Sequence, residues 1–136
     1  SDAEGFGLAT LESLSCGTPI IVNMTGGLQE QVTDGENWFG IGIEPSSKAV
    51  IGSQDIPYIF EDRINEDHFI DALEKLYNMS KEERAKLGEA GRQHVIANYN
   101  FKKFNLTWQD LIKDILEKHG SWENRKGYNS WELIEV

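Results

Sequence analysis

The 136-residue sequence has few cysteines, few cations and no long apolar runs. Its single cysteine, Cys16, excludes an internal disulfide framework. No apolar run approaches the roughly 20 residues that a membrane-spanning helix needs, and no basic-then-apolar signal opens the chain. The 13 Lys and Arg residues against 23 Asp and Glu residues give a net charge of −10, which argues against nucleic acid or anionic membrane as a partner. We therefore expect a soluble, cytoplasmic protein without an integral membrane segment.

The shortage of cations is greatest in the first part of the chain. Residues 1–60 hold eight acids and one base, Lys48, for a sum of −7, whereas residues 61–136 hold 15 acids and 12 bases, for a sum of −3. The second part therefore has the composition of ordinary solvated helix surface. The apolar fraction of 39%, with 10% aromatics, is sufficient for a packed core.

The first 45 residues alternate between helical and strand patterns. Leucines recur at helical spacing within residues 7–16, and residues 28–32 could form a second, short helix. Residues 19–23 and 39–43 are short apolar runs without alternation, as expected of strands that are covered on both faces of a parallel sheet. This order of elements predicts an α/β layer.

The remaining residues are predicted to be mainly helical. Residues 44–65 contain proline, glycine and serine, and they predict an irregular loop of unusual length. Three helices follow, and the second of them opens with a capping box made by Ser80 and Glu83. The expected helices cover residues 67–79, 80–99 and 101–120, and the aromatic tail after them, from Ser121, is expected to pack against another surface.

The segment from Glu4 to Glu12 carries the most chemical information. A helix that starts near Gly7 turns its first N–H groups outward, and such an end binds anions. Gly5 and Gly7 have no side chains, so a ligand can approach the backbone closely. Glu12 leans back toward the same helix end because helical side chains tilt toward the N-terminus. A carboxylate accepts hydrogen bonds from sugar hydroxyls, and an open helix end binds phosphate. A carboxylate on each side of the helix end therefore matches a nucleotide sugar, in which a diphosphate lies between the sugar hydroxyls and the ribose hydroxyls.

With these residues identified, the sequence resembles the retaining glycosyltransferases of the GT-B fold, especially glycosyltransferase family 4. Glu4, seven further residues and Glu12 are similar to the E-x7-E motif of that family. The similarity is sharp over residues 3–43 and loose over residues 66–118. It continues in order through Gly17-Thr18-Pro19, Gly26-Gly27-x-x-Glu30 and Asp34-Gly35.

The resemblance implies an α/β fold, namely the C-terminal half of a Rossmann-like, nucleotide-sugar-binding domain. That domain is expected over residues 1–119, with a C-terminal tail over residues 120–136. No metal or other cofactor is implied, because the nucleotide sugar is the substrate and electrostatic contacts stabilise its departing diphosphate. The implied catalytic residue is Glu4, which contacts the donor sugar, and the other implied donor-binding residues are Gly5, Phe6, Gly7, Leu8, Gly26, Gly27 and, on the ribose, Glu12.

The sequence departs from the family in its lack of cations near the motif. Members of the family grip the diphosphate with an Arg and a Lys, whereas the first 60 residues here contain only Lys48. A helix dipole, worth roughly 0.3–1 kcal/mol per interaction, cannot hold a diphosphate by itself. We therefore expect the C-terminal part of a longer enzyme, inactive alone, whose missing partner is an N-terminal acceptor domain.

Other interpretations of the same residues stay open. The two glutamates could be ordinary surface acids, Gly26-Gly27 could be only a turn, Cys16 is expected to fill space at a helix end, and His94 to be a hydrogen-bonded helix residue. Two strands are too few for an independent sheet, so either upstream strands or another copy of the chain, in a homo-oligomer, covers the exposed edge. The alternative functions are a non-catalytic binding or assembly module and an epimerase or phosphorylase of related architecture.

Overall fold

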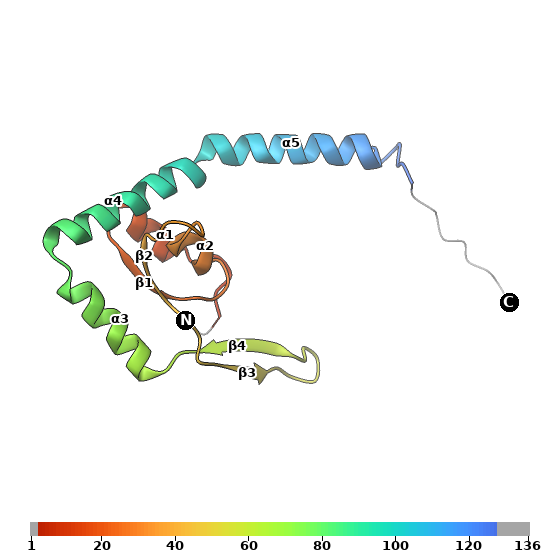
Figure 1. Cartoon of the computed structure of the whole chain (residues 1–136). Helices are drawn as coiled ribbons and strands as arrows, with labels where there is room; N and C mark the ends of the chain where they lie inside the picture. The colour runs from red at the N-terminus through yellow and green to blue at the C-terminus, as the bar shows by residue number, and fades with distance from the viewer. Residues whose placement is uncertain (1–2, 128–136) are drawn as a thin grey trace. The chain divides into compact units, whose positions relative to one another are not determined.

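The structure is a computed structural model that describes residues 3–127 (Figure 1). Packing divides the chain into two units, Ser1–Asn98 and Tyr99–Val136, which are described separately here. The first unit contains parallel strands and the described part of the second consists mainly of one helix, so the predicted α/β class with a helical C-terminal segment is confirmed. The expected domain over residues 1–119, with a tail over residues 120–136, stays a prediction.

A small parallel sheet lies at the centre of the first unit. Strand β1 (Ile20–Asn23) pairs with β2 (Gly40–Ile43) in parallel, with Ile21 opposite Ile41. Helix α1 (Leu8–Ser15) precedes the sheet and α2 (Leu28–Val32) connects its two strands. These four elements confirm the predicted order of helix, strand, helix and strand.

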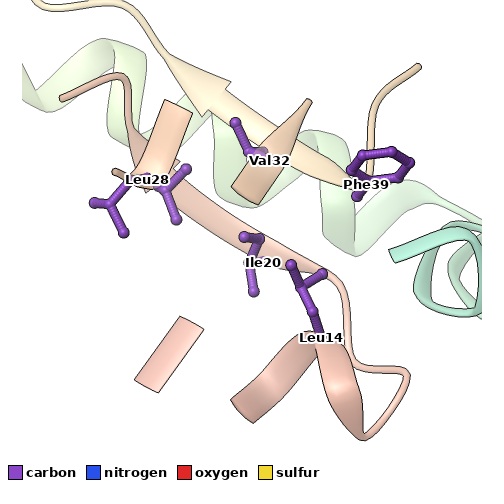
Figure 2. Packing of buried hydrophobic residues seen from close by; sticks show 6 residues of the cluster. Leu14, Ile20, Leu28, Val32 and Phe39 are labelled. Carbon is purple, nitrogen blue, oxygen red and sulfur yellow. The ribbon is translucent and has the colours of Figure 1, made fainter. Parts of the chain in front are cut away.

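Apolar side chains cover both faces of this sheet, which explains why its strands show no alternation in sequence. On one face, Leu14 of α1 and Val32 of α2 join Ile20 and Phe39 in the larger core cluster (Figure 2). On the other face, Ala72 of α3 (Glu66–Asn78) packs with Ile41 and Ile43, and Ile21 lies against them. The sheet is therefore a buried layer between helices.

Helix α4 (Lys81–Asn98) packs against α1 through glycines. A Cβ atom at Gly88 would lie 1.9 Å from the carbonyl oxygen of Gly17, so the backbones approach very closely. Nearby, the His94 ring stacks on Phe39 with centroids 4.3 Å apart, and its Nε2 lies 3.0 Å from the carbonyl oxygen of Glu30. His94 is thus a hydrogen-bonded packing residue, as predicted.

Two expectations about the first unit are wrong. Cys16 is the C-cap of α1, and its side chain is exposed and fills no space in the core. Residues 44–65 do not form an irregular loop, because β3 (Ser47–Ile51) and β4 (Ile59–Arg63) pair as an antiparallel hairpin (Figure 1). The prolines and the glycine that suggested a loop, Pro45, Gly52 and Pro57, lie outside the two strands, whereas Ser47 is the first residue of β3.

The described part of the second unit consists mainly of α5 (Phe101–His119). Asn100 caps its first turn through a 2.9 Å hydrogen bond from the Lys103 N–H to Oδ1, and Gly120 ends it, as predicted. The apolar stripe of α5 is exposed along its whole length, with Phe104, Trp108 and Ile112 among its members. Of the tail aromatics that were expected to pack, Trp122 is 82% exposed, and Tyr128 and Trp131 lie outside the described residues. Among residues 3–127, no helix is long and apolar enough to cross a bilayer.

The predicted capping box at the start of α4 is confirmed and leads to a pH dependence. The Ser80 N–H donates to Glu83 Oε2 at 2.7 Å, and the Glu83 N–H donates to Ser80 Oγ at 3.1 Å. The first of these bonds, from the backbone of Ser80, is the main cause that holds the pKa of Glu83 below its ordinary value of 4.5. A lowered pKa in the folded state means that this stabilisation is present above the unfolded pKa and is lost as the pH falls through the folded pKa.

We expect the melting temperature of the chain to decrease as the pH is lowered from about 6 to about 3, partly because Glu83 becomes protonated. The variant Glu83→Gln keeps a side chain that can accept the Ser80 bond but does not titrate, so its melting temperature should fall less over the same range. Circular dichroism melts of both proteins at several pH values make the comparison. Equal falls in the two proteins would show that Glu83 contributes nothing to the pH dependence.

Candidate functional site

The N-terminus of α1 is open and lacks a side-chain cap. Gly7 is the N-cap with a φ of 83°, and no side chain there accepts a hydrogen bond from the helix. The Leu11 N–H, which donates to the Gly7 carbonyl oxygen at 3.3 Å, makes the first bond of the helix. The N–H groups before Leu11 therefore point out of the helix end. This geometry confirms the predicted helix start near Gly7.

A hollow of about 260 Å³ lies at this helix end. Its walls come from the loop before α1, the first turn of α1, the start of α2, both strands of the parallel sheet, the segment that connects β4 to α3, and the first turn of α3. The polar side chains in its walls are those of Glu4, Thr10 and Asn23, and none of its lining residues is a cation. The lining residues are Glu4, Gly7, Leu8, Ala9, Thr10, Ile21, Val22, Asn23, Leu28, Ile43, Ile64 and Phe69.

The Gly26-Gly27 turn lies directly against the loop that carries Glu4. The Gly27 N–H donates to the Gly5 carbonyl oxygen at 3.2 Å. A Cβ atom at Gly26, whose φ is 48°, would lie 1.7 Å from the carbonyl oxygen of Glu4. A Cβ atom at Gly27 would lie 2.8 Å from the carbonyl oxygen of Gly5. The turn therefore needs glycine at both positions, and the structure brings it together with the predicted site loop.

The two glutamates of the predicted motif differ in their surroundings. Glu4 is half-buried in the wall of the hollow, and its Oε1 accepts the Gly5 N–H at 3.1 Å. Glu12 is exposed and is not among the lining residues. It follows Leu8 by four residues, so it lies on the same side of α1 as Leu8, one turn farther from the helix end. Phe6, also predicted for the site, is 47% exposed.

The sequence analysis missed most of the lining residues of the hollow, among them Asn23, Ile64 and Phe69. Asn23 is 6% exposed at the carboxyl end of β1, which is the edge at which ligands bind in open α/β sheets. A polar residue that ends an apolar run was the available signal. Ile64 and Phe69 come from beyond the hairpin, and no local pattern connects them with Glu4. Among residues 3–127, no group of three His, Cys, Asp or Glu side chains could hold a metal ion.

Comparison with known proteins gives the family of this chain. Residues 1–94 match the family described as glycosyl transferases group 1. This matched region includes all lining residues of the hollow, the loop with Gly5 and Gly7, and the Gly26-Gly27 turn. The chain belongs to this family. The match ends within α4, so α5 lies outside the matched region.

Two curated relatives of this group 1 chain are themselves named glycosyltransferases. A D-inositol 3-phosphate glycosyltransferase from Acidothermus cellulolyticus is 51% identical over 37 residues, which are 27% of this chain and 8% of that protein. The second is a GDP-mannose-dependent monoacylated alpha-(1-6)-phosphatidylinositol monomannoside mannosyltransferase from Corynebacterium glutamicum. It is 31% identical over 101 residues, which are 74% of this chain and 21% of that protein.

A solved structure shares the fold of this group 1 chain. Sucrose-phosphate synthase from Thermosynechococcus elongatus superimposes with a TM-score of 0.60 at 22% identity, covering 86% of this chain and 26% of that chain. This likeness supports the α/β architecture of the GT-B fold. The chain spans at most about a quarter of the length of each of these three proteins.

Proposed function

We propose that this chain is the donor-binding portion of a retaining glycosyltransferase that moves a sugar from a nucleotide sugar to an acceptor. The observation that carries the proposal is the uncapped N-terminus of α1, which opens into a hollow with Glu4 in its wall. An open helix end attracts the phosphates of a donor, and a carboxylate accepts hydrogen bonds from sugar hydroxyls. The membership of the group 1 family supports the same reaction class.

Each residue of the predicted motif has a role in this proposal. Glu4 is the catalytic residue, which contacts the transferred sugar, while the backbone N–H groups of Phe6, Gly7 and Leu8 donate to the sugar and the phosphates. Glu12 binds the ribose hydroxyls from the Leu8 side of α1. The Gly26-Gly27 turn lies beside the donor, and Gly5 lets it approach the backbone. We propose no metal, because the backbone donors of the helix end, together with cations from other parts of a longer enzyme, would stabilise the departing diphosphate.

The hollow accounts for only part of such a site. Its volume of about 260 Å³ lies below the roughly 300–1,000 Å³ of pockets that enclose a ligand of drug size. Its lining includes an acid and no cation, so it does not neutralise a diphosphate. We therefore propose that the cations that hold the diphosphate and the acceptor domain belong to other parts of a longer enzyme, and that the 136-residue chain alone transfers no sugar.

The ribose role of Glu12 is tested in the enzyme that contains this sequence. Glu12→Ala should weaken the affinity for the nucleotide sugar about tenfold, since it removes a charged acceptor of hydroxyl bonds. Isothermal titration calorimetry with GDP-mannose, UDP-glucose and other common donors measures the change. The matched control is Glu36→Ala, which removes an exposed acid outside the hollow and should leave the affinity unchanged.

The same enzyme separates the proposed function from its alternatives. Transfer with retention of the anomeric configuration, followed by nuclear magnetic resonance of the product, supports the retaining transferase. Binding of the donor without transfer to any acceptor indicates a binding or assembly module, and inversion at a ring carbon of the bound sugar indicates an epimerase. Sugar transfer at ordinary enzyme rates by the 136-residue chain alone contradicts the need for the other parts.

A further inference from the structure

A buried amide side chain lies directly behind the loop of the candidate site. Gln31 of α2 is 0% exposed although its side chain is polar, and it lies between the core residues Leu28 and Val32 in the sequence of α2 (Figure 2 shows these two residues). Its Nε2 donates to the carbonyl oxygen of Phe6, and its Oε1 accepts from the hydroxyl of Thr10. Both partners belong to the loop and first turn that carry the predicted donor-binding groups.

These hydrogen bonds determine which way one peptide unit of the loop faces. In a planar trans peptide, the C=O and the following N–H point in opposite directions. The Phe6 carbonyl is held inward by the buried Gln31, so the Gly7 N–H is directed away from Gln31. Within residues 3–127, no acceptor takes the Gly7 N–H, and Gly7 lines the hollow.

The hydroxyl of Thr10 reinforces this arrangement from the helix side. Its Oγ1 lies 2.7 Å from the carbonyl oxygen of Gly7 as well as against Gln31, so it connects the N-cap of α1 with α2. The backbone bond from Gly27 to Gly5 holds the preceding carbonyl in the same manner, at 3.2 Å. The loop is thereby preorganised by the fully buried Gln31 and by the partly buried Thr10 and Gly27.

We infer that Gln31 is a positioning residue of the donor site. It turns the Gly7 N–H toward the hollow, where that group donates to an anionic, phosphate-bearing ligand. This inference rests on the proposed donor-binding function. An amide is needed at this position because the residue must donate to Phe6 and accept from Thr10 at once, which neither an apolar side chain nor a carboxylate can do.

The test compares Gln31→Leu with Val32→Ala in the enzyme that contains this sequence. Both variants alter fully buried residues of α2, so both lower the stability, but only Gln31→Leu frees the Phe6 carbonyl. Uridine diphosphate and guanosine diphosphate are titrated at a temperature at which all proteins are folded. Gln31→Leu should lose about tenfold in affinity, the loss of one hydrogen bond to a charged group, whereas Val32→Ala should stay close to the unchanged enzyme.

Variants of Thr10 distinguish hydrogen bonding by its hydroxyl from packing by its side chain, because the two roles predict opposite orders of affinity. Thr10→Ser keeps the hydroxyl and should retain most of the diphosphate affinity, whereas Thr10→Val keeps the shape but loses the hydroxyl and should lose affinity. If the site needed only packing at this position, the order of the two variants would be reversed. In Gln31→Leu, the further change Thr10→Val should add little, because both belong to the same set of bonds.

Amide resonances separate a failure of this inference from a failure of the proposed function. In the ligand-free protein, the Gly7 amide signal should move in Gln31→Leu and stay in Val32→Ala. If the unchanged enzyme binds neither diphosphate, the donor-binding function fails and the Gly7 signal alone decides the inference. Equal diphosphate affinity of Gln31→Leu and the unchanged enzyme, or an unmoved Gly7 signal, overturns the positioning role.

Discussion

Gly26→Ala is expected to lower the affinity for a nucleotide sugar about 100-fold without unfolding the protein. The new Cβ would lie 1.7 Å from the carbonyl oxygen of Glu4, a backbone atom that cannot move without its loop. The φ of 48° adds strain for a residue with a side chain. Together these effects correspond to about 3 kcal/mol, the upper part of the range for overpacked sites. The loop that carries Glu4 should shift away from the hollow.

Calorimetry on the enzyme that contains this sequence measures the effect, with circular dichroism to verify folding. Gly35→Ala is the matched control, since Gly35 also has a positive φ, of 95°, but a Cβ there meets nothing within 4 Å. Wild-type affinity in Gly26→Ala would show that the turn does not support the donor site.

The second large effect is expected from Gly88→Ala, which should lower the free energy of unfolding by about 2–3 kcal/mol. Alanine improves helix propensity by about 1 kcal/mol, so on propensity alone the substitution would stabilise α4. The structure reverses this expectation, because the new Cβ would lie 1.9 Å from the carbonyl oxygen of Gly17 and 3.3 Å from Pro19. Helices α4 and α1 must then separate, and the core beneath them loosens.

Urea denaturation of the chain and its variants measures this change. Gly91→Ala is the graded comparison, since its Cβ would meet side-chain atoms, Leu14 Cδ2 at 2.5 Å and Phe39 Cβ at 3.3 Å, and a side-chain end can move more easily than a backbone carbonyl. We expect a loss of about 1 kcal/mol there. Glu89→Ala, on an exposed position of the same helix, should change the stability by less than about 0.5 kcal/mol. A stabilised Gly88→Ala variant would contradict the close approach of α4 to α1.

Local signals were sufficient for most of the elements. The leucine spacing of residues 8–14, the glycine after it and the apolar run of residues 20–23 each describe a single element within a few residues. The Ser80 and Glu83 capping box likewise involves a contact three residues apart, and the structure has both of its hydrogen bonds. Such elements could be predicted because their stabilising contacts are close in the sequence.

The hairpin β3–β4 could not be predicted in this way. Its strands are exposed on both sides, so they show no apolar alternation, and the glycine and proline residues between them looked like a long loop. Cross-strand pairs, such as Lys48 with Asp62 at 3.6 Å, join residues that are 14 positions apart. No local periodicity records pairs of this kind.

By itself, the sequence determined the order of the elements outside the β3–β4 hairpin, the α/β class and a candidate ligand-binding helix end at Gly7. The tertiary structure alone decided that Glu4 lines a hollow with Asn23 and Phe69, that the Gly26-Gly27 turn lies against the Glu4 loop, and that Gln31 is bonded to Phe6. Patterns in a sequence report contacts within one turn or one strand. A site assembled from segments about 20 or more residues apart depends on how the elements pack together, and the sequence pattern of one element contains no information about that packing.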